Sequence, residues 1–384
     1  MVEDSAISVG VQDMKILIDG RFYGLEHAGI GRYSMNLIDE LAKQDRQNEY
    51  VVLLAPKYFK LLKFPRNWTK VNVPFRHYTI TEQVKLPFII AKHKPDLCHF
   101  LHFNVPVFYF GKFVVTLHDM EMHKSQGKEA TTRDFLSYRL WRLGYKFVFA
   151  NAARRSAKII VPTKVVRNEI ANYYKLPKKK FEVAYEGVGS HFFKPVNQKV
   201  AAKILKKFGL VGRKYFFYNG NAYPHKNLPV AIEAIKKLGE LFVIASSRSV
   251  FTKRLESEIK NMDAQKHVKL LGFVTDDELR ALHQNAIAFV YPSLMEGFGL
   301  QGLEAMASGS FLCASDIPIF REIYKDNALY FDPHSEEAVA DALTKALDME
   351  PNERRDRLTK ATKHVKNFTW EKMAKKTLAT YKTF

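Results

Sequence analysis

The chain has 384 residues, which exceeds one ordinary hydrophobic core and fits two domains. Its hydrophobic content of 47% and aromatic content of 13% exclude an intrinsically disordered protein. No apolar run approaches the ~18 residues of a membrane-spanning helix, and the N-terminus lacks the basic and apolar blocks of a signal peptide. Two cysteines in apolar, strand-like contexts add to the expectation of a cytoplasmic protein with reduced thiols.

The net charge of +20 is unevenly spread along the chain. Between Lys124 and Lys180 there are fifteen lysines and arginines but only three acidic residues, a local excess of +12. Such a field attracts polyanions. An anionic membrane surface, a nucleic acid and a phosphorylated substrate are the candidates, and the first would make the protein peripheral on the inner face of a membrane.

The first half of the chain alternates short apolar runs with helical patterns, after a leader over residues 1–13 that we expect to be unstructured. Strands that alternate with helices indicate a parallel, doubly wound sheet. Ligands of such sheets bind beyond the carboxyl ends of the strands. The expected strands are Lys15–Asp19, Tyr50–Leu54, Leu97–Leu101, Phe113–Leu117 and Lys158–Val161.

Two features of this half stand where a ligand would bind. Gly29 and Gly31 open the first helix, and glycines let a backbone approach a phosphate or sugar closely. A lone Gly-x-Gly is a weak signal, and no third glycine or acidic strand end completes a dinucleotide fingerprint. His118 directly follows the expected strand Phe113–Leu117, so it should point toward the cleft, with a satisfied rim histidine as the alternative.

The segment 133–147 shows two apolar faces when it is drawn as a helix. We expect one narrow stripe to face the core, formed by Leu136, Leu140, Leu143 and Phe147. The opposite face carries Tyr138, Trp141 and Tyr145, bordered by Arg139, Arg142 and Lys146. That face suits a membrane surface or a lipid-linked acceptor, and an interdomain or dimer contact accounts for it equally well.

Around Phe193–Pro195 the pattern starts again, which indicates a second α/β domain after a linker over Glu186–Pro195. The tail from Phe368 to Tyr381 has the pattern of an amphipathic helix. The expected strands of this half are Tyr215–Tyr218, Leu241–Ala245, Val268–Leu271, Ala286–Tyr291 and Phe311–Ala314.

A cationic loop follows the first strand of the second series. Asn227 suits a helix N-cap and Pro229 a first helical turn, so Lys226 stands just ahead of a helix N-terminus. There its charge can meet a phosphate that faces the helix dipole, and an exposed loop lysine is the alternative. The neighbouring His225, if neutral at pH 7, supplies a hydrogen bond at most.

The most informative motif follows the expected strand Ala286–Tyr291. Glu296 begins a Gly-Phe-Gly turn that ends at Gly299, and the next helix carries Glu304 about a turn and a half from its start. A strand, a Gly-x-Gly turn and a helix start present free amides and a positive dipole end to an anion. This arrangement suits a sugar nucleotide, with amides for the diphosphate, one carboxylate for the sugar and one for the ribose.

The same segment, with Tyr291-Pro-Ser before it and Leu303-Glu-Ala-Met-Ala-Ser-Gly309 at its end, resembles the Glu-x7-Glu signature of family 4 retaining glycosyltransferases. The resemblance extends from about Met14 to the end of the chain. It implies an α/β fold of the GT-B type, in which two Rossmann-like domains face a cleft and a C-terminal helix crosses back. The acceptor-side domain would be 1–192 joined by the helix 366–384, and the nucleotide-sugar-binding domain 193–365.

The resemblance also implies roles for the matching residues. Glu296 would hold the donor sugar, Glu304 the ribose and Lys226 the leaving diphosphate, while His225 stands where the family usually has an arginine. His118 would bond the donor sugar near the reacting carbon, and the Gly29–Gly31 loop would close over the diphosphate. The implied catalytic set is His118, Lys226 and Glu296. The implied donor-binding set is Gly29, Gly31, Lys226, Glu296, Gly297, Phe298, Gly299 and Glu304.

The Tyr291-Pro-Ser to Leu300 pattern and the Pro224-x-Lys-Asn227 loop most resemble mannosyltransferases of surface polysaccharide or glycolipid assembly. The resemblance therefore implies a retaining glycosyltransferase, with mannose from GDP-mannose as the expected donor group and a glycan or lipid-linked acceptor. No cofactor and no metal are expected, because no Asp-x-Asp motif is present to hold the diphosphate through a divalent ion. A UDP-sugar transferase (glucosyl or N-acetylglucosaminyl) and a UDP-N-acetylglucosamine 2-epimerase of the same architecture are alternatives. A nucleic-acid-binding protein would explain the charge but not Glu296 and Glu304, and no nucleic-acid-binding motif is recognisable.

Overall fold

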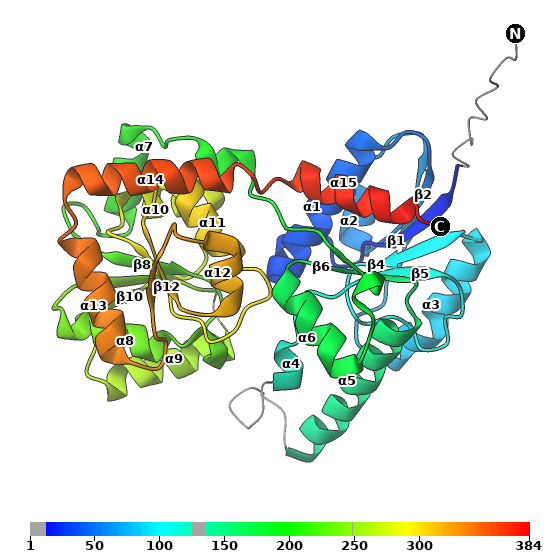
Figure 1. Ribbon diagram of the computed structural model, residues 1–384, viewed down its shortest axis with the longest axis horizontal. Helices are drawn as coiled ribbons and strands as arrows, with labels where there is room; N and C mark the ends of the chain where they lie inside the picture. The colour runs from blue at the N-terminus through cyan, green and yellow to red at the C-terminus, as the bar shows by residue number, and fades with distance from the viewer. Residues whose placement is uncertain (1–12, 125–134, 248) are drawn as a thin grey trace, which may run out of the picture.

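The computed structural model describes residues 13–124, 135–247 and 249–384. Two parallel sheets lie side by side along its long axis (Figure 1). The strand order is β3-β2-β1-β4-β5-β6-β7 in the first sheet and β10-β9-β8-β11-β12-β13 in the second. Each pair of neighbouring strands is parallel. The predicted arrangement of two doubly wound α/β domains is thus confirmed.

The apolar runs predicted all the interior strands and the edge strand β10, to within three residues at either end. Three further strands lie at sheet edges, where partial exposure interrupts the apolar run. The first sheet consists of β1 (Lys15–Asp19), β2 (Glu49–Leu54), β3 (Trp68–Asn72), β4 (Leu97–Phe100), β5 (Phe113–Thr116), β6 (Lys158–Val161) and β7 (Phe181–Val183). The second consists of β8 (Phe216–Asn219), β9 (Phe242–Ala245), β10 (Val268–Leu270), β11 (Phe289–Tyr291), β12 (Leu312–Ser315) and β13 (Leu329–Phe331).

Helices connect the strands and cover the sheets; in Figure 1, α10, α11 and α14 lie above the second sheet and α8, α9 and α13 below it. The helices of the first half are α1 (Ala28–Gln44), α2 (Pro56–Leu61), α3 (Ile80–His93), α4 (Glu121–Lys124), α5 (Phe135–Arg155) and α6 (Lys164–Tyr174). Those of the second half are α7 (Gln198–Lys207), α8 (Leu228–Lys237), α9 (Val250–Asn261), α10 (Asp276–Asn285), α11 (Leu300–Ala307), α12 (Pro318–Tyr324), α13 (Glu336–Leu347), α14 (Pro351–Val365) and α15 (Trp370–Tyr381). None of the helices in these described ranges is long and apolar enough to cross a bilayer.

The chain crosses between the sheets twice, and the two crossings run side by side (Figure 1). The amide of Val188 donates to the carbonyl of Phe368 over 3.1 Å. A Cβ on Gly187 would come within 2.0 Å of the backbone nitrogen of Trp370, so only glycine fits there. The final helix, α15, then packs on α1, as the resemblance implied. The limits at residues 192 and 365 stay a prediction.

The topology fixes where a ligand can bind. The strand order reverses at β1 and β4 in the first sheet and at β8 and β11 in the second. Loops leave the carboxyl ends of strands on opposite sides of such a reversal, which opens a crevice there. The Gly29–Gly31 turn comes after β1, the Lys226 loop after β8 and the Glu296 loop after β11.

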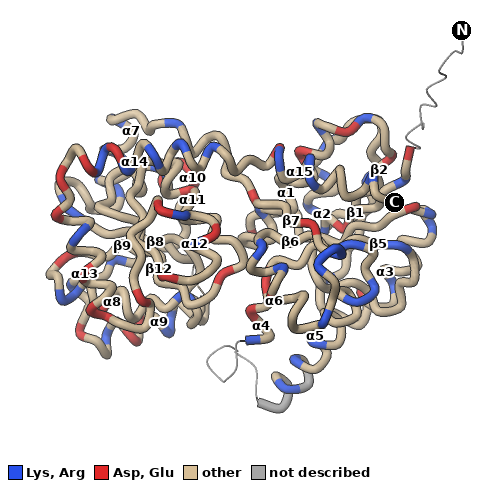
Figure 2. Tube along the Cα trace, in the orientation of Figure 1, with Lys and Arg blue, Asp and Glu red and all other residues tan. Residues whose placement is uncertain are grey.

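Helix α5 is turned the other way round from the prediction. Leu143 and Phe147 are exposed to 66% and 63%, whereas Tyr138 and Tyr145 are buried. The side chains of Leu136 and Leu140 lie outside the described residues. The Tyr145 hydroxyl bonds His123 Nδ1 over 2.9 Å. Large aromatic groups with a polar tip gain more from this partly polar interior than leucines do, which explains the inversion. Lysines and arginines recur along the helix (Figure 2).

Candidate active site in the cleft

Lys226 and Glu296 are in contact, although they come from the separate loops after β8 and β11. Lys226 Nζ lies 2.6 Å from Glu296 Oε1, which also accepts a hydrogen bond from Ser293 Oγ over 2.8 Å. Both side chains are about nine-tenths buried. Because isolated buried charges are costly, the contact between the two groups offsets part of the cost of burying them.

The loop after Glu296 touches the first domain. A Cβ on Gly297 would lie 2.4 Å from the carbonyl oxygen of His118, so this position has room only for glycine. Thr163 Oγ1 donates to the carbonyl of Gly297 over 3.5 Å. The end of β5 and the start of the Gly-Phe-Gly turn are therefore in direct contact across the cleft.

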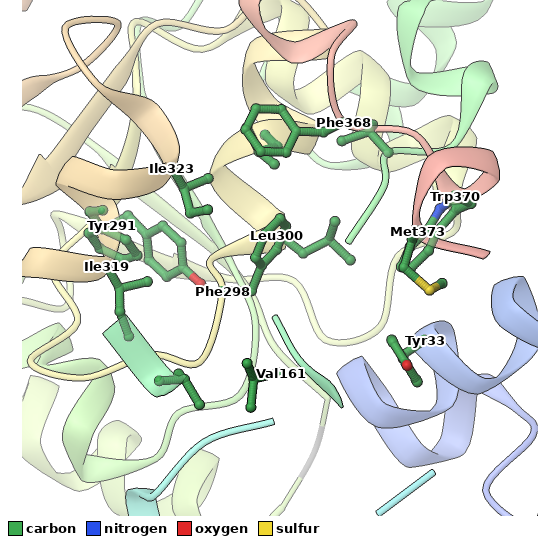
Figure 3. Packing of buried hydrophobic residues seen from close by; sticks show 14 of the residues in the cluster. Tyr33, Val161, Tyr291, Phe298, Leu300, Ile319, Ile323, Phe368, Trp370 and Met373 are labelled. Atoms are coloured by element: carbon green, nitrogen blue, oxygen red, sulfur yellow. The ribbon is translucent and has the colours of Figure 1, made fainter. Parts of the chain in front are cut away.

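Buried aromatic residues contact the remainder of the turn, Phe298 and Gly299. Gly299 has φ +91°, a left-handed conformation that favours glycine, and Tyr324 donates its hydroxyl proton to the Gly299 carbonyl. The Phe298 ring is buried, with its centroid 6.4 Å from that of Tyr185. Its centroid lies 6.1 Å from that of Phe368 (Figure 3). Of the first-turn amides of α11, that of Gly302 bonds the Gly299 carbonyl over 3.2 Å, and those of Leu300 and Gln301 precede the hydrogen-bonded part of the helix.

His118 is held at the rim of the cleft. Its Nε2 donates to the carbonyl of Leu101 over 3.0 Å, and its Nδ1 lies 3.7 Å from Glu186 Oε1. Because a carbonyl can only accept, Nε2 carries the proton. The ring also packs edge-on against Tyr33, with centroids 4.7 Å apart. The structure therefore places the backbone of His118 beside Gly297, and the role of its side chain stays a prediction.

His225 faces a carboxylate of the first domain. Its Nδ1 lies 2.8 Å from Glu121 Oε1. Burial raises the pKa of Glu121, but the hydrogen bond and charge of His225 outweigh burial and hold the pKa below its ordinary value. Asp119, two residues earlier, has a raised pKa because of burial and the negative charge of Glu121. The neighbouring Asn227 does occupy the position before α8, but its side chain bonds Pro333 instead of capping the helix, contrary to the prediction.

Glu304 lies in a cavity of about 460 Å³ between the domains. Arg32 Nη1 reaches it from α1, 3.4 Å from Oε1, and Arg32 Nη2 lies equally far from Asp276. Burial raises the pKa of Glu304 to about 7, against the opposing effect of Arg32. Gly29 lines this cavity with open space at its Cα.

Gly31 has a structural reason to be glycine, because a Cβ there would lie 1.8 Å from the carbonyl oxygen of Gly24. Gly31 is buried and is not among the residues that line the cavity. A second cavity, of about 490 Å³, lies on the other side of the α1 start and is lined by Ile30 and His118. The start of α1 therefore divides the cleft into two compartments.

We expect nucleotide affinity to depend on the ionisation of Glu304. The resemblance implies that Glu304 bonds the ribose, and a hydroxyl bonds a carboxylate more strongly than a neutral acid, so the affinity should fall roughly fivefold as the pH drops through 7. Because the folded-state pKa is raised, ionisation of Glu304 should also lower the free energy of unfolding of the empty protein as the pH rises. Calorimetric titration of GDP and UDP between pH 6 and 8 measures the first effect. A Glu304→Gln variant with the same pH dependence would contradict it.

Three site residues escaped the sequence reasoning, namely Arg32, Glu121 and Asp276. Arg32 directly follows the Gly-x-Gly turn at the helix start, which could have identified it. Glu121 and Asp276 carry no such signal, because their importance comes only from the other domain that faces them.

Comparisons with known proteins identify the family. Residues 27–191 match the model of Glycosyltransferase Family 4, and residues 201–365 match that of Glycosyl transferases group 1. Together the two matches cover most of the chain. The protein belongs to glycosyltransferase family 4.

Relatives and solved structures agree with this assignment. The glycosyltransferase is 24% identical to O-antigen chain mannosyltransferase B of Escherichia coli, over 92% of this chain and 96% of that one. It is 27% identical to O-antigen chain mannosyltransferase RfbU of Salmonella typhimurium over 60% of each chain. The crystal structure of HepE from Anabaena in complex with UDP and glucose has the same fold, with a TM-score of 0.75 at 16% identity, covering 97% of this chain and all of that one. The fold of this glycosyltransferase is therefore GT-B.

Proposed function

We propose that this glycosyltransferase moves mannose from GDP-mannose to a hydroxyl of a glycan or lipid-linked acceptor, with retention of configuration and without a metal ion. The buried Lys226–Glu296 pair beside the Gly297 turn carries the proposal. The mannosyltransferase relative that aligns over nearly its whole length supports the choice of mannose. The UDP complex of a protein with the same fold keeps UDP-sugars as the competing donor class.

The geometry supports this chemistry through positioning and charge. A diphosphate over the first turn of α11 would face amide donors and the helix dipole, with Lys226 beside it. Negative charge grows on the leaving diphosphate as the glycosidic bond breaks, so a fixed cation there stabilises the transition state more than the ground state. Glu296, already held by Lys226 and Ser293, is preorganised to accept hydrogen bonds from sugar hydroxyls.

A thermal-shift panel of GDP, UDP, NAD and a short RNA tests the class of ligand. A ligand at one hundred times its Kd adds about 2.7 kcal/mol to the free energy of unfolding. The proposal expects the largest shift with GDP. A larger shift with UDP would mean that the donor is a UDP-sugar and not GDP-mannose. A shift with RNA alone would overturn the enzymatic function.

We expect full activity in excess EDTA. The proposal assigns the neutralisation of the diphosphate to Lys226 and backbone amides, so no divalent ion is required. Rates of GDP release from GDP-mannose should agree within twofold with EDTA, magnesium or manganese. Loss of the rate in EDTA with recovery on adding either ion would refute metal independence.

We further propose that the outer face of α5 rests on an anionic membrane surface. The inverted helix presents Leu143 and Phe147 outward, and Arg139 on the same helix is exposed as well. Phe110, which is 80% exposed, lies 4.9 Å from the guanidinium of Arg155. Exposed apolar groups bordered by cations are what an interfacial segment requires.

The protein should therefore sediment with vesicles of anionic lipid and not with neutral ones. Each cation near such a surface contributes about 1 kcal/mol, screened beyond about 10 Å at 0.1 M salt. A Leu143→Ser/Phe147→Ser variant should lose the binding that survives high salt. Tyr173→Ser, which removes an exposed aromatic residue from α6, is the matched control. Equal binding to both kinds of vesicle, or binding to neither, would contradict the proposal that α5 rests on an anionic membrane surface.

A further inference from the structure

The second cavity has an aromatic wall formed by one face of α5. The rings of Tyr138, Trp141 and Tyr145 follow one another with centroids 6.4 and 5.9 Å apart and with planes inclined by only 19° and 15°. All three line the cavity. Tyr138 and Tyr145 are buried, whereas Trp141 is half-buried. Three nearly parallel rings therefore form a continuous aromatic stretch of the cavity wall.

Polar groups that can bond hydroxyls line the same cavity. Asp119 and Glu121 lie in its wall, together with His225. Carboxylates accept hydrogen bonds from hydroxyl groups, but they repel a phosphate. An aromatic wall beside hydroxyl acceptors matches a pyranose ring, which has a C–H face and a rim of hydroxyls.

The cavity also adjoins the reaction site. His118 lies in its wall, and the carbonyl of His118 is the group that leaves no room for a side chain at Gly297. A molecule in this cavity is therefore next to the Gly-Phe-Gly turn, while the start of α1 separates it from the cavity that holds Glu304.

We propose that the second cavity binds the terminal sugar of a glycan acceptor, with its ring stacked on Trp141 and its hydroxyls bonded to Asp119 and Glu121. This inference rests on the proposed function, because it names the acceptor of that reaction. It assigns the sugar end of the acceptor, and not a phosphate, to the contact beside His118.

The test uses α-linked mannobiose as the probe, with GDP present, and measures its Kd by calorimetry. Trp141→Ala should raise the Kd about tenfold, because loss of a stacked ring costs roughly that much. Trp141→Phe should restore most of the affinity. Phe147→Ala is the matched control, since Phe147 lies on the same helix but is exposed outside the cavity.

A direct signal should accompany binding. The other two tryptophans, Trp68 and Trp370, are each only 7% exposed. Saturable quenching of tryptophan emission by mannobiose should therefore come from Trp141 and disappear in Trp141→Phe.

Three results would overturn the inference. One is an unchanged Kd in Trp141→Ala, another is an equal loss in Phe147→Ala, and the third is tighter, Trp141-dependent binding of farnesyl phosphate than of mannobiose. Release of GDP from GDP-mannose by the wild-type protein, measured without any acceptor, reports separately on the proposed function. If the protein hydrolyses GDP-mannose but does not bind the sugar, only the proposed acceptor site is contradicted, and the proposed function stands.

Discussion

Replacing Lys226 by alanine is expected to lower kcat by about 10²- to 10³-fold, the usual effect of removing one group that stabilises transition-state charge. The Lys226 ammonium is fixed 2.6 Å from Glu296, so it cannot be replaced by a mobile surface cation. Single-turnover rates with GDP-mannose measure the effect. Lys237→Ala is the matched control, because Lys237 is also paired with a glutamate but is exposed at the end of α8.

The same substitution leaves Glu296 as a buried carboxylate without its cation, which would cost about 3–5 kcal/mol of stability. A Lys226→Ala/Glu296→Gln double variant should recover most of that stability and none of the activity. Recovery of both properties together would mean that Lys226 only compensates a buried charge. Wild-type turnover in a folded Lys226→Ala protein would mean that another cation stabilises the charge of the leaving diphosphate.

Gly297→Ala is expected to reduce kcat/KM by at least about 10²-fold, the effect of misplacing reacting groups by roughly 1 Å. The added Cβ would lie 2.4 Å from the His118 carbonyl, and neither backbone can yield without moving the two domains apart. Gly144→Ala serves as the control, since a Cβ at this position in α5 meets nothing within 4 Å. Steady-state kinetics with thermal unfolding in parallel makes the measurement. Full activity of Gly297→Ala would show that catalysis does not require the close contact between Gly297 and the His118 carbonyl.

The sequence predicted what depends on local pattern. Interior strands such as β1 and β6 are continuous apolar runs, so their limits could be read directly. The edge strand β7 is only partly buried and gave no such run. Glu296, Gly297 and Glu304 were recognisable because the strand, the turn and the helix are contiguous in the chain.

What remained hidden depends on contacts between distant segments. The pairing of Arg32 with Glu304 and of His225 with Glu121 arises only when the two domains face each other. The orientation of α5 was predicted wrongly because both of its faces are apolar, and only the packing of Tyr145 on His123 decides which face is buried. Local periodicity carries no information on that choice.

The most direct test of the account is the anomeric form of the sugar released from GDP-mannose in EDTA when water is the acceptor. Proton NMR during the first minutes, before mutarotation, distinguishes the two anomers. We expect α-mannose, which has the configuration of the donor, from the wild-type protein and at least about 10²-fold less of it from Lys226→Ala. First-formed β-mannose, release only with a divalent ion, or release from UDP-sugars alone would contradict it.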